Sequence, residues 1–198
     1  MNYLAHAHLS FGDAQVLTGN MISDYVKGKA QFSYPENIQT GIRLHRAIDD
    51  FTDTHPSTKA IMSLFRPQYR LYSGAFTDVV YDYFLANDKD EFINSQALMD
   101  FTQVTYQQLE QQQSHFPPKF KMAFPYMISQ NWLYHYQFDE GMKKSFNGLV
   151  HRAAYLYESE IAFEIFMHNK ALIGQHYKDF FVSVKKFAAH RLSELLKK

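Results

Sequence analysis

The chain contains 198 residues, of which 46% are hydrophobic, so it can bury a substantial core and we expect a single domain over residues 1–198. The absence of cysteine excludes disulfides, thiol catalysis and thiolate metal sites. The formal net charge is zero and no dense stripe of Lys and Arg occurs, so we expect no nucleic-acid binding. Since the sequence shows neither a membrane-spanning apolar run nor a signal-peptide pattern, we expect a cytoplasmic protein that does not bind membranes.

Apolar residues recur at helical spacing along almost the whole chain, whereas alternating β-branched runs are absent. In chain order, helices are predicted over about residues 14–27, from 35 to a break at 52–56, and over 57–66, 75–87, 90–112, 119–137, 142–169 and 173–196. Gly28 is expected to stop the first helix and Pro67 the third, and Asn147-Gly148 to kink or break the seventh. The pattern predicts an all-α fold, a single compact domain of many helices.

The zero net charge conceals an uneven distribution along the chain. Residues 1–114 contain 8 Lys and Arg against 13 Asp and Glu, a net of −5, and residues 115–198 contain 12 against 7, a net of +5. An acidic half suits a metal site, and a basic half suits an acidic partner. Ordinary variation of a protein surface produces the same difference, and on charge alone we prefer that interpretation.

Several polar residues recur four positions apart, the spacing that places two side chains on one helical face. The sets are Asn2 with His6, Asn20 with Asp24, His45 with Asp49 and Asp53, and Asp78 with Asp82. They lie among core residues, where carboxylates are costly unless they are paired or bind a metal. A mixed shell of imidazole and carboxylate suits Mn²⁺, Fe²⁺ or Zn²⁺, whereas an all-oxygen shell suits Mg²⁺ or Ca²⁺. The first 82 residues are therefore expected to hold a divalent metal.

Each of these residues also has a purely structural interpretation. A lone histidine is more often a hydrogen-bonded core residue than a ligand. Asp13 and Asp53 are suited to cap helices. Asp50 is expected to face solvent, and Asp88 is expected to lie in a turn. Aromatic residues such as Trp132 belong more often to a core than to a substrate pocket. Four pairs within 82 residues nevertheless favour a site.

Five segments of the sequence resemble one known family. They are M-N-Y-L-A-H-A-H-L at the start, G-N-M-I-S-D-Y-V-K-G at 19–28, G-I-R-L-H-R-A-I-D-D-F-T-D at 41–53, D-V-V-Y-D-Y-F-L at 78–85 and N-W-L-Y-H-Y around Trp132. In identity and order they resemble the acyl carrier protein phosphodiesterase family, over nearly the whole chain. One position departs from the family's pattern, because Tyr83 stands where a histidine is common and a neutral phenol is a poor metal ligand.

The resemblance implies hydrolysis of the phosphodiester that links 4′-phosphopantetheine to a serine of holo-acyl carrier protein, leaving the apo-protein. It also implies that the chain belongs to a divergent, all-helical branch of the HD-domain phosphohydrolases. Activity is then expected to depend on a divalent metal, most often Mn²⁺, with Fe²⁺, Mg²⁺ and Zn²⁺ as alternatives. Together with the helical spacing, it predicts six metal ligands, namely His6, Asp24, His45, Asp49, Asp78 and Asp82.

Further roles follow from the expected substrate. Asp49 or Asp82 is expected to orient the attacking water or relay its proton. Phosphate binding is assigned to Arg46, Arg152, Asn2 and Asn20. Because acyl carrier proteins are acidic, docking is assigned to four lysines of the basic half, Lys143, Lys144, Lys185 and Lys186.

Two other functions remain open at this point. The first is an HD-type phosphohydrolase that acts on a nucleotide or another small phosphodiester and ignores the carrier protein. The second is a helical protein that binds metal without catalysis, although the paired Glu-x-x-His signatures of a di-iron bundle are absent. Neither the oligomeric state nor the identity and number of the metal ions follows from the sequence.

Overall fold

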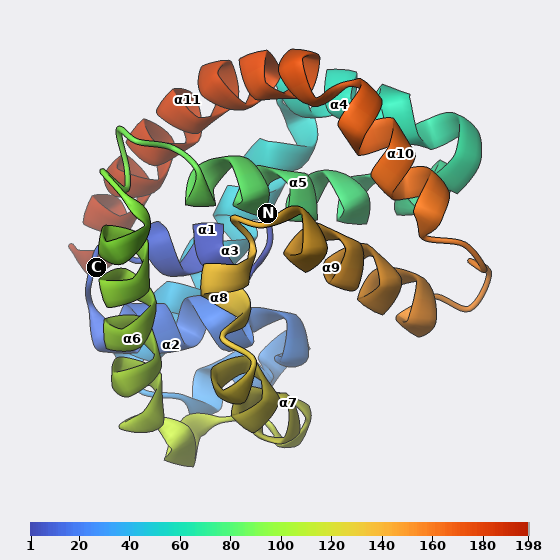
Figure 1. The fold of residues 1–198 in the computed structure, drawn as a ribbon. Helices are drawn as coiled ribbons and strands as arrows, with labels where there is room; N and C mark the ends of the chain where they lie inside the picture. Colours follow the sequence, from blue (N-terminus) through green and yellow to red (C-terminus); the bar gives the residue numbers. More distant parts are fainter. Residues whose placement is uncertain (198) are drawn as a thin grey trace.

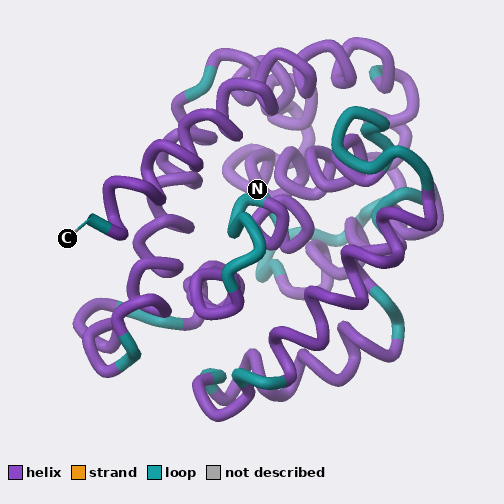
Figure 2. Tube along the Cα trace, turned by 90° about the vertical axis from the view of Figure 1, so that its left-hand side faces the viewer, coloured by secondary structure: helices purple, strands orange, loops and turns teal. Residues whose placement is uncertain are grey.

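A computed structural model describes residues 1–197, and no strand occurs among them, which confirms the predicted all-α fold (Figure 2). The helices are α1 (Tyr3–His8), α2 (Ala14–Ile22), α3 (Glu36–Thr54), α4 (Pro56–Tyr69), α5 (Ser73–Ala86), α6 (Ser95–Glu110), α7 (Pro118–Ser129), α8 (Trp132–His135), α9 (Asp139–Arg152), α10 (Glu160–His168) and α11 (Lys170–Leu196). Four 3₁₀ turns connect them, η1 (Ser23–Tyr25), η2 (Gly28–Ser33), η3 (Arg70–Tyr72) and η4 (Gln113–His115). Within the described part of the chain, no helix combines the length and hydrophobicity that crossing a membrane requires.

The long helix α11 arches over one side of the molecule and packs against α3, α4 and α5 (Figure 1). Aromatic rings fill this contact. Phe187 of α11 stacks on Phe51 of α3 with ring centroids 4.5 Å apart, and Phe180 stacks on Tyr81 of α5 at 4.3 Å. These contacts hold α3 and α5 in one core, and the N-terminus enters that core beside α5 and α9 (Figure 1).

Helices α2 and α3 cross at an unusually close approach, which two glycines make possible. A Cβ atom at Gly19 would overlap the carbonyl oxygen of Ile38 and lie 2.9 Å from the Cα of Gly41. A Cβ atom at Gly41 would in turn overlap the carbonyl oxygen of Val16 and lie 2.9 Å from the Cα of Gly19. The crossing sets the position of Asn20, the residue after Gly19, and of the part of α3 that follows Gly41.

Three of the predicted helix signals in the first half of the chain are wrong. Gly28 does not stop the first helix, because α2 already ends at Ile22 and Gly28 begins η2. Pro67 does not stop α4, which continues to Tyr69 and ends at Arg70, where φ is +46°. Proline removes one hydrogen-bond donor and crowds the preceding turn, but only two residues of α4 follow Pro67, so the helix ends soon after it. Asp53 lies within α3 and does not cap α4, because the Nδ1 atom of His55 accepts the hydrogen bond from Ser57 N at 3.2 Å.

The later helices begin or break at other residues than predicted. The helix predicted from 90 starts at Ser95, where the side chain of Asn94 caps it by accepting from Ala97 N at 2.9 Å. The helix predicted over 119–137 is divided into α7 and α8 by Asn131, whose φ is +43°. The helix predicted over 142–169 breaks at residues 153–159, whereas Asn147-Gly148 lies inside α9. The boundaries of α3, α5 and α11 agree more closely, and Asp13 caps α2 as predicted by accepting from Gln15 N and Val16 N.

Candidate metal centre

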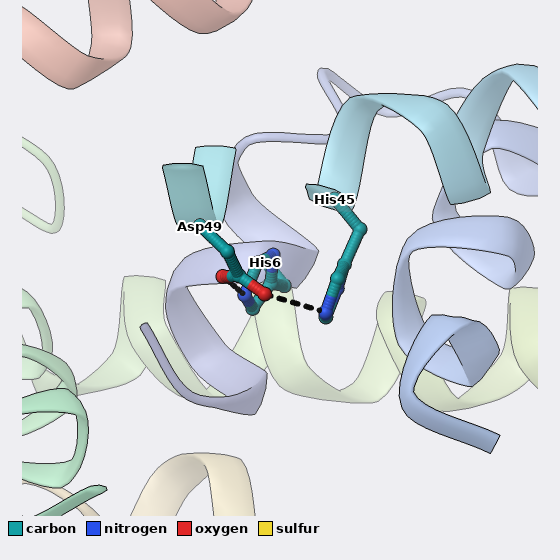
Figure 3. Close-up of side chains that lie close together, drawn as sticks. All are labelled: His6, His45 and Asp49. Atoms are coloured by element: carbon teal, nitrogen blue, oxygen red, sulfur yellow. Dashed lines mark ion pairs between the residues drawn. The ribbon is translucent and has the colours of Figure 1, made fainter. Parts of the chain in front are cut away.

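Three side chains from two helices converge at the junction of α1 and α3 (Figure 3). His6 lies on α1, and His45 and Asp49 lie one turn apart on α3. Asp49 Oδ1 lies 3.2 Å from His6 Nε2, and Asp49 Oδ2 lies 3.0 Å from His45 Nε2. The two imidazole rings stack with centroids 3.9 Å apart. Two imidazole nitrogens and a carboxylate therefore meet in one small, nearly buried volume.

The atoms that face one another in this cluster have no hydrogen bonds within the described residues. His6 Nε2, His45 Nε2 and Asp49 Oδ1 are all buried without a partner of hydrogen-bond geometry. Buried polar atoms are rarely left in this state, because the loss of hydration costs about 1–3 kcal/mol for each group. The three residues supply one ligand atom each, and these atoms all lie within 4.8 Å of one another. The donor set fits a divalent cation.

Asn20 determines which nitrogen of His6 faces the cluster. Its amide nitrogen donates to the carbonyl oxygen of His6 at 2.9 Å and to Ser10 Oγ at 3.0 Å. Its amide oxygen must then accept from His6 Nδ1, which lies 2.8 Å away. His6 Nδ1 therefore carries the hydrogen, and the Nε2 lone pair points at Asp49 Oδ1. Two lone pairs 3.2 Å apart repel each other unless a cation lies between them.

Burial and neighbouring charges shift the pKa values of His6 and His45 in opposite directions. Burial, reinforced by the nearby His45, lowers the pKa of His6 to about 4, so that His6 is neutral at pH 7. Burial opposes protonation of His45 as well, but the carboxylates of Asp24 and Asp49 outweigh it and raise the pKa of His45 to about 9. Partial burial opposes the charge of Asp49, but the two imidazoles outweigh it and hold the pKa of this carboxyl well below the usual range. A neutral imidazole and an ionised carboxylate are the forms that bind a metal.

Two further predicted ligands lie at the edge of the cluster. Asp24, in η1, places Oδ1 3.3 Å from His45 Nε2, and its side chain is 73% exposed. Asp78, on α5, forms an ion pair with the α-ammonium group of Met1, with its Oδ1 3.0 Å from the nitrogen. The same nitrogen lies 3.6 Å from Asp49 Oδ1. Burial opposes the charge of that ammonium, but the two carboxylates outweigh it and raise its pKa to about 10. Asp24 thus adds negative charge beside His45, whereas the α-ammonium group of Met1 balances the charge of Asp78.

Asp82, the sixth predicted ligand, is turned toward the backbone of α1. Its two carboxylate oxygens accept hydrogen bonds from Leu4 N at 2.7 Å and Ala5 N at 3.1 Å. These are N–H groups of the first helical turn, which have no partner inside the helix. Burial raises the pKa of Asp82 to about 7, although the two backbone donors oppose the shift. The carboxylate fixes α1 on α5 and thereby positions His6.

We expect Asp82→Ala to destabilise the protein strongly, because it leaves two buried N–H groups without acceptors. The free energy of unfolding should fall by about 2–4 kcal/mol, measured by urea denaturation. Asp82→Asn, which keeps one acceptor oxygen, should lose less. Asp50→Ala, at an exposed position of α3, is the control and should change stability by no more than about 0.5 kcal/mol. Equal stability of the Asp82 and Asp50 alanine variants would contradict the anchoring role.

The four residues predicted to bind phosphate are distributed over different places. Asn20 positions His6, as described above. Arg46 is used within the fold, since it donates to the carbonyl oxygen of Val26 at 2.9 Å and to Gln31 Oε1 at 3.1 Å. Asn2 donates to the hydroxyl of Tyr136 at 2.9 Å. Asn2 and Arg152 line one pocket, which lies beside α8 and α9.

The four predicted docking lysines do not form one surface. Lys143 pairs with Glu140 at 2.8 Å, and Lys185 donates to Glu91 Oε1 at 2.8 Å. Lys186 is exposed on α11. Lys144 lines the pocket next to α8 and α9. Two of the four lysines are therefore neutralised by carboxylates of their own chain.

Tyr83, the departure from the family pattern, lies away from the cluster. One residue on from Asp82, its side chain turns toward α10, where its ring packs edge-on against Phe166 with centroids 5.0 Å apart. The ammonium group of Lys170 lies over the same ring, 4.6 Å from its centroid. The phenol is thus part of the core contact between α5 and α10, and His6, His45 and Asp49 converge without it.

A pocket of about 410 Å³ lies between the N-terminus, α8 and α9. No pocket was predicted from the sequence here, although the segment around Trp132 and the candidates Asn2, Lys144 and Arg152 contribute to it. Trp132, an aromatic residue of the kind more often found in a core, lines the pocket together with Tyr136, which is buried. Its wall is made from residues 129–152 together with Asn2, Tyr3 and Val79. Helical spacing cannot reveal such a pocket, because the residues that form it come from different helices.

Comparisons with known proteins agree on one family. The family model described as acyl carrier protein phosphodiesterase matches residues 1–184. A protein of Yersinia pestis named acyl carrier protein phosphodiesterase is 38% identical over 136 residues, 69% of this chain and 70% of the relative. One of the same name from Photorhabdus laumondii is 31% identical over 180 residues, 91% of this chain and 87% of the relative. No solved structure was found that matches this chain.

Proposed function

The chain belongs to the acyl carrier protein phosphodiesterase family, and on this basis we propose that it hydrolyses holo-acyl carrier protein. The bond cleaved is the phosphodiester between 4′-phosphopantetheine and a serine of the carrier protein. Water adds to phosphorus, the serine oxygen leaves with a proton, and the products are apo-acyl carrier protein and free 4′-phosphopantetheine.

We further propose that His6, His45 and Asp49 hold a divalent metal ion. The observation that carries this proposal is the lone pair of His6 Nε2 facing Asp49 Oδ1 in a buried volume without hydrogen bonds. Two imidazoles favour Mn²⁺, Fe²⁺ or Zn²⁺ over Mg²⁺, which prefers oxygen ligands. Mn²⁺ is the first candidate to test. Asp24, whose Oδ1 lies 3.3 Å from His45 Nε2, is placed to act as a further ligand or as a partner of bound water, while Asp78 is paired with the α-ammonium group beside Asp49.

A metal bound at these residues would supply a Lewis acid for the phosphoryl oxygens and lower the pKa of a water molecule. The protein residues have separate tasks around it. Asp49 faces both histidines with its two oxygens, which suits it to ligation. Asp24 is the carboxylate with access to solvent, so we assign it the acceptance of the proton from the attacking water. Asp82, whose two oxygens accept backbone N–H groups, acts as a positioning residue.

The basic face of α9 is the part of the surface that we propose for docking of the acidic carrier protein. Lys144 and Arg152 form no ion pair within residues 1–197, and both line the pocket beside this helix. Lys185 contributes less, because Glu91 already neutralises it. Lys144→Glu should therefore lower the association rate with carrier protein more than Lys185→Glu does.

One assay tests the proposed function. Purified protein is incubated with holo-acyl carrier protein and Mn²⁺, and the mass of the carrier protein is measured. We expect the loss of the phosphopantetheine arm, its prevention by a chelator and its recovery when Mn²⁺ is returned. An unchanged carrier-protein mass in the presence of bound metal would overturn the proposal. Parallel incubation with a nucleotide phosphodiester tests the alternative of a small substrate.

The proposed ligand set predicts a pH dependence of metal binding. In the metal-free protein the pKa of His45 is about 9, whereas that of His6 is about 4, so only His45 is protonated at pH 7. The metal must displace this proton, and affinity should rise about tenfold per pH unit from pH 7 until it levels off near pH 9. Calorimetry in buffers of different ionisation enthalpy should show about one proton released at pH 7. An affinity independent of pH over this range would contradict ligation by His45.

A further inference from the structure

The pocket beside α8 and α9 carries positive charge without a balancing carboxylate. Lys144 and Arg152 both line it, and no Asp or Glu is among the residues that do so. Within residues 1–197 neither side chain forms an ion pair or a hydrogen bond, whereas the adjacent Lys143 is paired with Glu140. Gly148, one turn before Arg152, leaves room for the guanidinium, because a Cβ atom at Gly148 would lie 3.4 Å from Arg152 Nη1. Two unpaired cations in a pocket favour an anionic ligand.

Asn131, which lines the pocket, has a side-chain hydrogen-bond acceptor that is not used within the described residues. Asn131 Oδ1 is buried without a partner, while the amide nitrogen of the same side chain is 3.3 Å from the sulfur of Met99. The backbone of Asn131 is in the left-handed region, with φ at +43°, a conformation that is uncommon for residues other than glycine. A buried acceptor that remains unpaired is costly. An N–H donor of a bound ligand, such as an amide, would pair with Asn131 Oδ1.

Aromatic rings form the remaining walls of the pocket. Trp132 and Tyr3 lie next to each other, with ring centroids 6.5 Å apart, and Tyr136 holds Asn2 through its hydroxyl group. Gly141 allows α9 to approach α8 here, because a Cβ atom at this position would overlap the carbonyl oxygen of His135. The volume of about 410 Å³ is within the range of about 300–1,000 Å³ that holds small ligands. Apolar walls with a few polar groups suit a ligand of mixed character.

Two residues that line the pocket are neighbours in sequence of carboxylates beside the candidate metal centre. Tyr3, which lines the pocket, shares a hydrogen bond of 2.8 Å with the hydroxyl of Tyr25, and Tyr25 follows Asp24 directly. Val79, which also lines the pocket, follows Asp78, whose Oδ1 lies 3.0 Å from the α-ammonium of Met1. The pocket and the surroundings of the metal centre are thus formed in part by the same chain segments, although none of His6, His45 and Asp49 lines the pocket.

We propose that this pocket binds the 4′-phosphopantetheine arm of the substrate, an inference that rests on the proposed function and adds its binding subsite. Lys144 and Arg152 neutralise the phosphate, Asn131 Oδ1 accepts from an amide N–H of the arm, and Trp132 covers its apolar carbons. These groups contact the arm itself, in addition to the docking of the carrier protein. The released 4′-phosphopantetheine should therefore still bind to the pocket after the reaction.

Trp132 provides a direct test, because it is the single tryptophan of the chain and lines the pocket. Free 4′-phosphopantetheine is titrated into the metal-free protein in the presence of a chelator, and binding is followed by tryptophan fluorescence and by calorimetry. We expect saturable binding that weakens at least tenfold in the double variant Lys144→Gln/Arg152→Gln. Pantetheine, which lacks the phosphate, should bind wild-type protein more weakly and be insensitive to the double variant.

The matched control is Lys143→Gln, which removes a neighbouring charge that does not line the pocket. It should bind the free arm like the wild type. Absence of saturable binding to the wild type by both methods, or equal affinity of the wild type and the double variant, would overturn the inference. If holo-acyl carrier protein is nevertheless hydrolysed, the proposed function stands without this subsite. Saturable binding without hydrolysis would instead contradict the proposed function.

Discussion

Asp49→Asn is expected to lower metal affinity at least about 100-fold and to abolish hydrolysis of holo-acyl carrier protein. Loss of a partner in the outer shell of a metal site already costs about 10–100-fold, and Asp49 is the one anionic residue among the three that converge. Asparagine has nearly the same shape as aspartate, but its NH₂ group cannot bind a metal. Its amide is also neutral, so it supplies no negative charge beside His6 and His45 to balance the cation.

The measurement combines metal content, metal titration and the carrier-protein assay, with Asp50→Asn as the matched control. Asp50 is the next residue of α3 and its side chain is exposed, so its substitution should leave all three quantities unchanged. Urea denaturation of the metal-free proteins separates loss of ligation from loss of fold. A folded Asp49→Asn protein that retains both wild-type metal affinity and activity would place the metal centre elsewhere.

Gly41→Ala is expected to have the second large effect, on the fold itself. The added methyl group overlaps the carbonyl oxygen of Val16, a backbone atom that cannot rotate away, so α2 and α3 must separate. Alanine favours a helix over glycine by about 1 kcal/mol, but forcing apart two buried helices should cost about 3–5 kcal/mol, the upper end for single substitutions. Gly19→Ala should behave in the same way, because its methyl group meets Ile38 O.

The consequence for the site follows from the position of the crossing. Asn20 follows Gly19 on α2, and His45 lies one turn beyond Gly41 on α3, so separation of the helices moves the groups that orient the ligands. Urea denaturation and metal titration should both report the loss. Gly74→Ala is the control, since its Cβ would have an ordinary contact of 3.8 Å with Met62 Cε. If the Gly41→Ala variant were as stable as the Gly74→Ala variant, this would contradict the close approach of α2 and α3 at Gly41.

The local sequence was sufficient for the helices and for the spacing of the site on α3. Apolar residues four and three apart predicted the all-α fold, because the period of an α-helix is a local property. His45 and Asp49 share one face for the same reason, and they converge in the structure. The ends of helices were less predictable, as Pro67 and Asp53 show, because a helix end depends on which of several competing hydrogen bonds forms.

Only the tertiary structure decided which of the four-apart pairs face one another. Asp82 has the same spacing from Asp78 as Asp49 has from His45, yet both its oxygens accept N–H groups of α1, which is 77–78 residues distant in sequence. Asn20 and Asp24 likewise separate, because α2 ends between them: Asn20 orients His6, whereas Asp24 turns outward in η1. Helical spacing defines a face of one helix, but the neighbour of that face depends on how distant helices pack, and the pocket at Trp132 arises in the same way.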